Sequence, residues 1–198
     1  MEVFDRLDAA RARWDVLKHP FYPRWECGEL SRDELGFYAG EYRRAVIALA
    51  HTAAAGGSEE HAAEESAHID LWDDFAAALD APLDREPTLE TEECAAAWTS
   101  DEPHEAAAIM YALESSQPAI SRTKLAGLVD HYGFQAGSPA VEYFALHAER
   151  DVEHAAEARE RLEREAAPGD VQRLAAAGEA ALAANWKLLD GAEAAFAS

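Results

Sequence analysis

The chain lacks the features that would mark a disulfide-bonded, secreted or membrane-spanning protein. It has only two cysteines, Cys27 and Cys94, with no CxxC pair, which is too few for a disulfide framework or a cysteine zinc site. No stretch approaches 18 consecutive apolar residues, and the N-terminus has neither the basic start nor the apolar run of a signal peptide. We therefore expect a cytoplasmic protein without a membrane partner, in which both thiols are reduced and structural.

Basic residues are also scarce. The chain has 17 lysines and arginines against 39 acidic residues, a formal charge of −22, and its only lysines are Lys18, Lys124 and Lys187. Repulsion from phosphate groups disfavours a nucleic-acid partner. The acidic, lysine-poor composition suits either a salt-loving host or an arginine- and alanine-rich bacterial genome, and it carries no information about a reaction.

The apolar residues recur with the 3.6-residue period of helices almost throughout, and no convincing alternating strand is found. This pattern predicts an all-α protein with a single domain over residues 1–198. The Pro-bracketed segment 19–24 is expected to turn the chain before a short segment that contains Trp25. Helices are predicted at about 2–17, 31–54, 58–79, 90–99, 103–117 (kinked or restarted at Pro118 to about 132), 138–165 and 170–190.

The most informative pattern is the triad His147, Asp151 and His154. At about 100° per residue, positions 0, +4 and +7 fall within roughly 60° of arc on one helix face. The apolar stripe that includes Val141 and Phe144 lies beside this face rather than opposite it, which favours a buried site over a solvated helix surface. Two imidazoles and a carboxylate so placed are typical ligands of a non-haem iron or manganese site.

Two further segments offer ligands of the same kinds. His61, Glu65 and His68 repeat the 0, +4, +7 spacing, although a polar run at a helix start can also be a solvated face. Glu114 ends an apolar helical turn, where a carboxylate is costly to bury without a metal or a hydrogen-bond partner.

Six ligands are thereby gathered from three helices, which is enough for two metal ions with open positions. Carboxylates can bridge two metals and imidazoles can terminate them, so the set favours a dinuclear oxidase over a one-metal hydrolase. The candidate ligands are Glu65, His68, Glu114, His147, Asp151 and His154.

Four motifs in order resemble the haem-oxygenase-like dimetal oxidases (HDO), within the TenA/PqqC-like group, and especially the CADD-like self-sacrificing para-aminobenzoate synthases. The match covers most of the chain. The motifs are His19-Pro-Phe-Tyr-Pro-Arg-Trp25 with Gly28-Glu-Leu, Ala67-His68-Ile-Asp-Leu-Trp72, Glu114-Ser-Ser-Gln-Pro118, and Tyr143-Phe144-Ala-Leu-His147 continuing to Asp151 and His154.

The resemblance implies a haem-oxygenase-like bundle of about seven helices and a site with two metal ions, Fe/Fe or Fe/Mn. Dioxygen would be the co-substrate, and an external reductant would be needed. In this family para-aminobenzoate for folate synthesis is thought to form from the protein's own side chains. Tyr22 matches the tyrosine that supplies the ring and Lys124 the lysine that supplies the amino group, while Tyr38 and Tyr143 match tyrosines that line the site.

The sequence departs from the family pattern at two places. Leu113 stands where another tyrosine is expected, and His61 occupies the position of a glutamate seven residues before His68. Either His61 replaces that glutamate as a ligand, or Glu65 or Glu64 supplies the carboxylate from nearer by, as Glu-x-x-His does in ferritin-like bundles. We select Glu65 and keep His61 and Glu64 as alternates.

Other functions remain open at this point. The same site could oxidise an external amino-acid or fatty-acid substrate, and a ferritin-like diiron protein would share the paired motifs. A non-enzymatic TenA-like binding or regulatory protein belongs to a different class. We expect small molecules or the protein's own side chains as substrate, and a homodimer.

Overall fold

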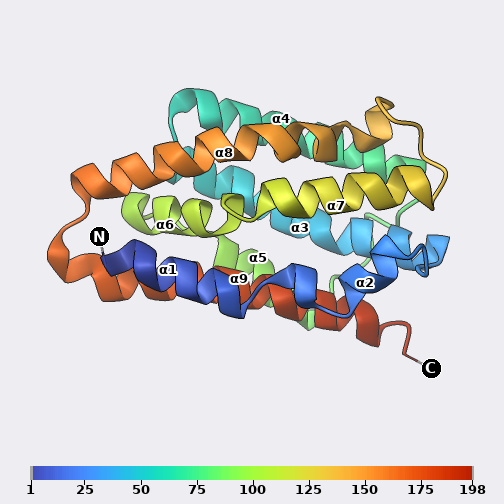
Figure 1. Ribbon diagram of the computed structural model, residues 1–198, viewed down its shortest axis with the longest axis horizontal. Helices are drawn as coiled ribbons and strands as arrows, with labels where there is room; N and C mark the ends of the chain where they lie inside the picture. Colours follow the sequence, from blue (N-terminus) through green and yellow to red (C-terminus); the bar gives the residue numbers. More distant parts are fainter. Residues whose placement is uncertain (1, 198) are drawn as a thin grey trace.

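The computed structural model describes residues 2–197, and these residues are almost entirely helical (Figure 1). The described part of the chain contains nine α-helices and two short 3₁₀ helices, and it contains no β-strand. The elements are α1 Glu2–Arg13, η1 Val16–Lys18, α2 Phe21–Glu26, α3 Arg32–Gly56, α4 Glu59–Ala78, α5 Leu89–Trp98, α6 Pro103–Glu114, α7 Gln117–Asp130, α8 Pro139–Glu165, η2 Pro168–Asp170 and α9 Val171–Ala194.

The long helices match the sequence prediction, but the N-terminal region does not. The first helix ends at Arg13, because the Asp15 side chain accepts the Leu17 N–H and caps a separate 3₁₀ turn. Segment 19–24 was predicted as a turn, yet α2 begins at Phe21. Pro23 is compatible with a helix here because N–H groups in a first turn need no intrahelical acceptor.

The helices form a layered bundle. Figure 1 shows α4 and α8 along one side, α6 and α7 end to end beneath α8, and α1 with α9 on the opposite side. In the middle, α3 packs against α4, α5 and α6, and α5 also packs against α9. This arrangement directs one face each of α4, α6 and α8 toward a common interior space.

The break between α6 and α7 determines where Glu114 and Lys124 lie in these helices. The chain leaves the helix at Ser115 and Ser116 and resumes at Gln117, with Pro118 in the first turn. The predicted break at Pro118 is therefore a restart of the helix, and together with α2 it raises the count above the expected seven. Glu114 ends α6, and Lys124 lies in the middle of α7.

A close approach between α2 and α7 positions the N-terminal motif. A Cβ atom at Gly127 would lie 2.6 Å from Trp25 Cδ1, so only glycine lets the indole pack this closely against α7. The Trp25 Nε1–H also donates to the Lys124 carbonyl at 3.1 Å. These contacts hold Tyr22, one turn earlier in α2, close to Lys124.

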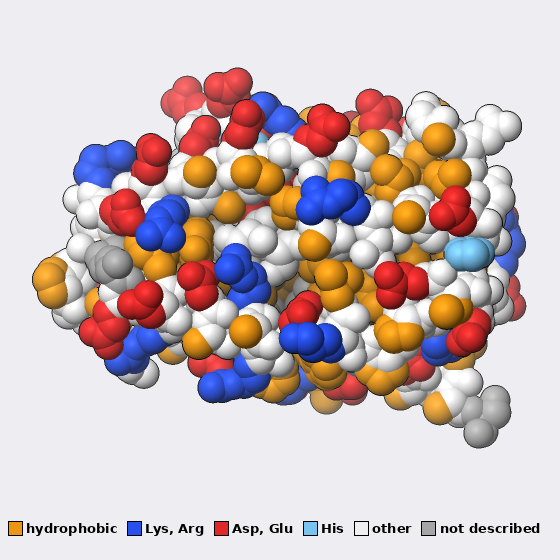
Figure 2. Space-filling model, in the orientation of Figure 1, with side chains coloured by type: hydrophobic (Ala, Val, Ile, Leu, Met, Phe, Trp, Pro, Cys, Tyr) orange, Lys and Arg blue, Asp and Glu red, His pale blue; other side chains and the backbone are white. Residues whose placement is uncertain are grey.

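None of the helices within residues 2–197 is long and apolar enough to cross a membrane. On the face drawn in Figure 2, acidic and basic side chains alternate with small apolar patches, and acidic groups gather along the edge formed by α4 and α8.

The N-terminus of α3 offers a test of local stability. Ser31 and Glu34 form a capping box in which the Ser31 Oγ accepts the Glu34 N–H at 3.2 Å and the Glu34 carboxylate accepts the Ser31 N–H at 2.8 Å. We expect Ser31→Ala to lower the free energy of unfolding by about 1 kcal/mol in urea denaturation. Ser138→Ala is the matched control, because Ser138 precedes α8 without a capping side-chain bond and should cost less.

Candidate metal centre

Helix α4 presents His61, Glu65 and His68 on its buried face. Ser58 starts the helix by accepting the His61 N–H at 3.1 Å, which sets the register of the three side chains. All three are nearly inaccessible to solvent, so the polar run at this helix start is not a solvated face.

Helix α8 faces α4 with the predicted triad His147, Asp151 and His154. Its side chains are as deeply buried as those of α4, and Val141 and Phe144 are buried beside them, as the apolar stripe predicted. Glu114 reaches the same space from the end of α6 and is 1% exposed.

Seven ligand candidates thus converge, and six of them form two overlapping groups whose ligand atoms lie within 4.8 Å of one another. The His61 group contains His61, Glu65, Glu114 and His154. The His68 group contains Glu65, His68 and His147. Within the described chain Glu65 alone belongs to both groups, which places it where a bridging carboxylate would lie.

Short distances support this central position of Glu65. Its Oε1 atom lies 3.0 Å from His68 Nδ1, 3.7 Å from His61 Nε2 and 3.9 Å from His154 Nδ1. His61 Nε2 also lies 3.1 Å from Glu114 Oε1, and its ring stacks on that of His154 at 3.8 Å between centroids.

Although some of them lie close to an oppositely charged group, many polar atoms of this cluster make no hydrogen bond of acceptable geometry among residues 2–197. They are His61 Nε2, His68 Nδ1, both Glu114 oxygens, His147 Nε2, both Asp151 oxygens and His154 Nδ1. Leaving so many buried polar atoms unpaired would be costly in a metal-free core, whereas bound cations would satisfy imidazole nitrogens and carboxylate oxygens together. The residues therefore fit two metal ions.

The electrostatics of the cluster also favour a cation. Burial raises the pKa of Glu114 to about 7 and that of Asp151 well above its usual range, because a carboxylate is poorly solvated there. Burial lowers the pKa of His147 to about 4. Burial alone would lower the pKa of His61, but the neighbouring Glu114 and Glu65 outweigh it and raise the pKa to about 10.

Two sequence candidates lie outside both groups. Asp151 Oδ1 lies 3.8 Å from His154 Nδ1, so Asp151 borders the His61 group. Its carboxylate oxygens do not lie within 4.8 Å of the ligand atoms of all the members of that group. Glu64 is part-exposed, and its carboxylate contacts His154 Nε2 at 2.9 Å, on the side of the ring away from Glu65. Of the two alternates, His61 belongs to one of the ligand groups and Glu64 does not.

Lys124 lies in an aromatic pocket next to this cluster. The ammonium nitrogen is 2.5 Å from the Tyr38 hydroxyl oxygen, and it lies 4.5 Å from the Tyr42 ring centroid and 5.8 Å from that of Tyr22. Complete burial lowers the pKa of Lys124 to about 7, so a large share of the amine is neutral near neutral pH. Burial also raises the pKa of Tyr22 and Tyr38, which keeps both phenols protonated.

Aromatic contacts join the lysine pocket to the metal candidates. The Tyr143 ring stacks on His147 at 4.0 Å and meets Trp72 at 4.8 Å, and Trp72 meets Tyr42 at 4.9 Å. Tyr42 was not named from the sequence, and Trp72 was named only as the end of the motif that begins at Ala67, without a role in the site. Their signal was present in the helical spacing, since Tyr42 lies four residues after Tyr38 and Trp72 four residues after His68.

Comparison with known proteins identifies the family. Residues 38–186 match the family model described as iron-containing redox enzyme, whose members are haem-oxygenase-like. The chain belongs to this family and is an oxidoreductase. The matched segment contains every ligand candidate and Lys124, whereas Tyr22 lies before it.

Curated relatives extend the similarity to most of the chain. A protein of Chlamydia muridarum named 4-aminobenzoate synthase is 31% identical over 186 residues, which cover 82% of this chain and 78% of the relative. A Nitrosomonas europaea protein of the same name is 32% identical over 211 residues, covering 89% of this chain and 85% of the relative. The predicted resemblance to this family is thus confirmed.

Solved structures confirm the fold. A TenA homologue from Pseudomonas syringae superposes with a TM-score of 0.75 at 18% identity and covers 97% of this chain and 91% of its own. A Shewanella denitrificans domain with a haem oxygenase-like fold gives the same TM-score and identity, with 96% and 90% covered. The all-α, haem-oxygenase-like bundle predicted from the sequence is correct.

Proposed function

We propose that this protein is a non-haem dimetal oxidase that forms 4-aminobenzoate, a precursor for folate synthesis, from its own Tyr22 and Lys124. The observation that carries the proposal is the pair of ligand groups sharing Glu65, with Lys124 buried among tyrosines beside them. The names of the curated relatives support the same product.

In this proposal the His61 and His68 groups would each hold one metal ion, with Asp151 available beside the first. Bound there, an Fe/Fe or Fe/Mn pair would supply dioxygen activation with electrons from an external reductant. The protein contributes a buried, preorganised set of ligands: the His147 Nδ1–H donates to the Tyr143 carbonyl at 2.7 Å, which turns Nε2 toward the centre.

The aromatic pocket prepares the two sacrificial residues. Tyr22, Tyr38 and Lys124 are each at most 2% exposed, so bulk water does not compete for them. The lowered pKa of Lys124 leaves much of its amine neutral. Only the neutral amine has a nitrogen lone pair that can form a new bond. Tyr38 binds that nitrogen through its hydroxyl and fixes it beside the Tyr22 ring.

Tyr22→Phe tests the sacrificial part of the proposal. The phenol oxygen is absent from the variant, so we expect no 4-aminobenzoate, while the number of iron ions bound per chain stays as in the wild type. Liquid chromatography with mass spectrometry of the product, and of the intact chain after reaction, measures both. Tyr111→Phe is the matched control, because Tyr111 is also buried but packs against Phe4 of α1 and donates its hydroxyl to Asp8 rather than contacting Lys124.

Wild-type protein should release at most one product molecule per chain, with a corresponding loss of mass from the polypeptide. Several turnovers per chain, or unchanged turnover of Tyr22→Phe, would instead identify an oxidase of an external amino acid or fatty acid. A preparation that stays metal-free and oxygen-inert after iron loading would favour a binding or regulatory protein.

A further inference from the structure

One polar contact at the edge of the cluster is not explained by metal ligation. His154 has two ring nitrogens, and they face different environments. Nδ1 points into the His61 group and has no partner in the described part of the chain, whereas Nε2 lies 2.9 Å from Glu64 Oε2. Glu64 is in turn held by Arg150, whose Nη2 donates to Glu64 Oε1 at 2.5 Å.

This arrangement selects one tautomer of His154. A carboxylate only accepts hydrogen bonds, so Nε2 must carry the proton that it donates to Glu64, and Nδ1 is left with its lone pair. That lone pair faces Glu65 Oε1 at 3.9 Å and Asp151 Oδ1 at 3.8 Å. A metal-binding histidine needs the same state, one nitrogen protonated and fixed by an outer partner and the other free for the cation.

His147 provides an internal comparison on the same helix. Its Nδ1 is fixed by the Tyr143 carbonyl, and its Nε2 has no partner among residues 2–197. Both α8 histidines are therefore fixed at one nitrogen and free at the other. The difference is that a backbone carbonyl fixes His147, while His154 depends on side chains from two helices, Glu64 on α4 and Arg150 on α8.

We propose that Glu64, anchored by Arg150, is a positioning residue that holds His154 in the tautomer and orientation needed to bind a divalent metal ion in the His61 group. The inference rests on the proposed function, because it assumes that both groups bind metal. It assigns Glu64 a role outside the ligand set.

The surroundings explain why an anchor is needed at this position. A cleft of about 140 Å³ opens between α4 and α8, and Glu60, Glu153 and Glu157 line it together with Glu64. Repulsion from these carboxylates would otherwise favour rotation of Glu64 into solvent. Arg150 offsets it by pairing with Glu64 and, at 2.7 Å, with Glu153.

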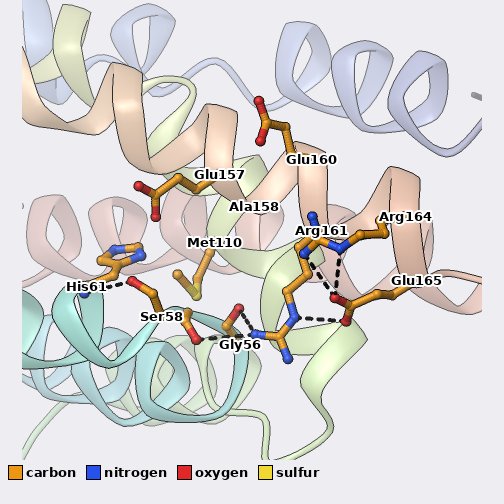
Figure 3. Close-up of a pocket in the computed structure, with 11 residues that line it drawn as sticks. Gly56, Ser58, His61, Met110, Glu157, Ala158, Glu160, Arg161, Arg164 and Glu165 are labelled. Carbon is orange, nitrogen blue, oxygen red and sulfur yellow. Dashed lines mark hydrogen bonds and ion pairs between the residues drawn. The ribbon is translucent and has the colours of Figure 1, made fainter.

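The His61 group also lies nearer to solvent than the His68 group. A second cavity has a volume of about 330 Å³. Among the residues that line it, Figure 3 shows Ser58 and His61 on one side and Glu157 of α8 on the other. The His68 group is covered instead by the Tyr143 and Trp72 rings. An outer partner therefore matters most for the His61 group, where water can compete for the free nitrogen of a rotating imidazole.

Cobalt(II) titration tests the role of Glu64, with the visible absorption of the bound ion and the stoichiometry as readouts. The wild type should bind two ions. Glu64→Ala should weaken one of the two sites about 10- to 100-fold and change its absorption bands, leaving the other site unchanged. Glu64→Gln keeps an acceptor oxygen and should retain most of the affinity, and Arg150→Gln should give an intermediate loss.

Glu60→Ala is the matched control, because Glu60 lies in the same cleft and carries the same charge but is exposed, and no hydrogen bond or ion pair joins it to His154 among the described residues. If folded Glu64→Ala binds both ions as the wild type does, the positioning role of Glu64 is overturned and the dimetal proposal is not. An equal loss of affinity in Glu60→Ala would also overturn that role, because it would indicate general electrostatic attraction of the cation. Wild-type protein that binds fewer than two ions would overturn the dimetal proposal and this inference together.

Discussion

Glu65→Ala is expected to weaken metal binding at both groups at once, the largest effect of any single ligand substitution. Among residues 2–197 Glu65 is the one residue shared by the His61 and His68 groups, and its Oε1 lies within 4 Å of three histidines. Removing a ligand should cost more than the 10- to 100-fold typical of outer partners, so we expect an affinity loss above about 100-fold at each site.

Metal content after iron loading and gel filtration measures this effect, together with cobalt titration. Glu114→Ala is the informative comparison, because Glu114 belongs to the His61 group alone. This substitution should remove one ion and leave the other bound. If Glu65→Ala still bound two ions while folded, the shared-carboxylate arrangement would be wrong.

Lys124→Met is expected to abolish the product and yet stabilise the protein at neutral pH. Burial lowers the pKa of Lys124 from 10.5 to about 7. Between these pH values the unfolded chain holds a proton that the folded chain lacks, so the free energy of unfolding rises with pH, by up to about 1.4 kcal/mol per pH unit. Below pH 7 both states are protonated and this contribution to the slope vanishes.

Methionine has no ionisable group and a similar length, so the variant should be more stable than the wild type at pH 7, and the contribution of Lys124 to the rise between pH 7 and 10.5 should disappear. Urea denaturation of metal-free protein across this range measures both effects. Lys187→Met is the matched control, since Lys187 is exposed and pairs with Glu93 on the surface at 3.4 Å. A variant that is less stable than the wild type at pH 7 would contradict the expected cost of burying the Lys124 amine.

Much of the secondary structure follows from local signals. Ser31 with Glu34, Ser58 and Ser138-Pro139 predicted helix starts that the structure confirms within a residue or so, because capping and proline act within a single turn. Local signals misled at segment 19–24, where two prolines indicated a turn. Packing of Trp25 against Gly127 of α7 stabilises a short helix there, and that contact spans about 100 residues of sequence.

The site shows the same division between local and distant information. Spacing placed His147, Asp151 and His154 on one face of a helix, and His61, Glu65 and His68 on another, because the helical period fixes which side chains share a face. Spacing left open which carboxylate of α4 would be central. Glu64 and Glu65 are neighbours in sequence, but the rotation of α4 against α8 directs Glu65 into the core and Glu64 toward His154 and Arg150 at the rim.

The sequence by itself determined an all-helical chain, the family, and three helix faces that carry imidazoles and carboxylates, since these depend on periodicity, capping and motif order. The tertiary structure alone decided that Glu65 is shared between two groups, that His61 joins one of them, and that Lys124 lies among Tyr22, Tyr38 and Tyr42. Each of these depends on how far one helix is turned and shifted against another. Interactions distributed over the whole core, rather than any local pattern, set that geometry.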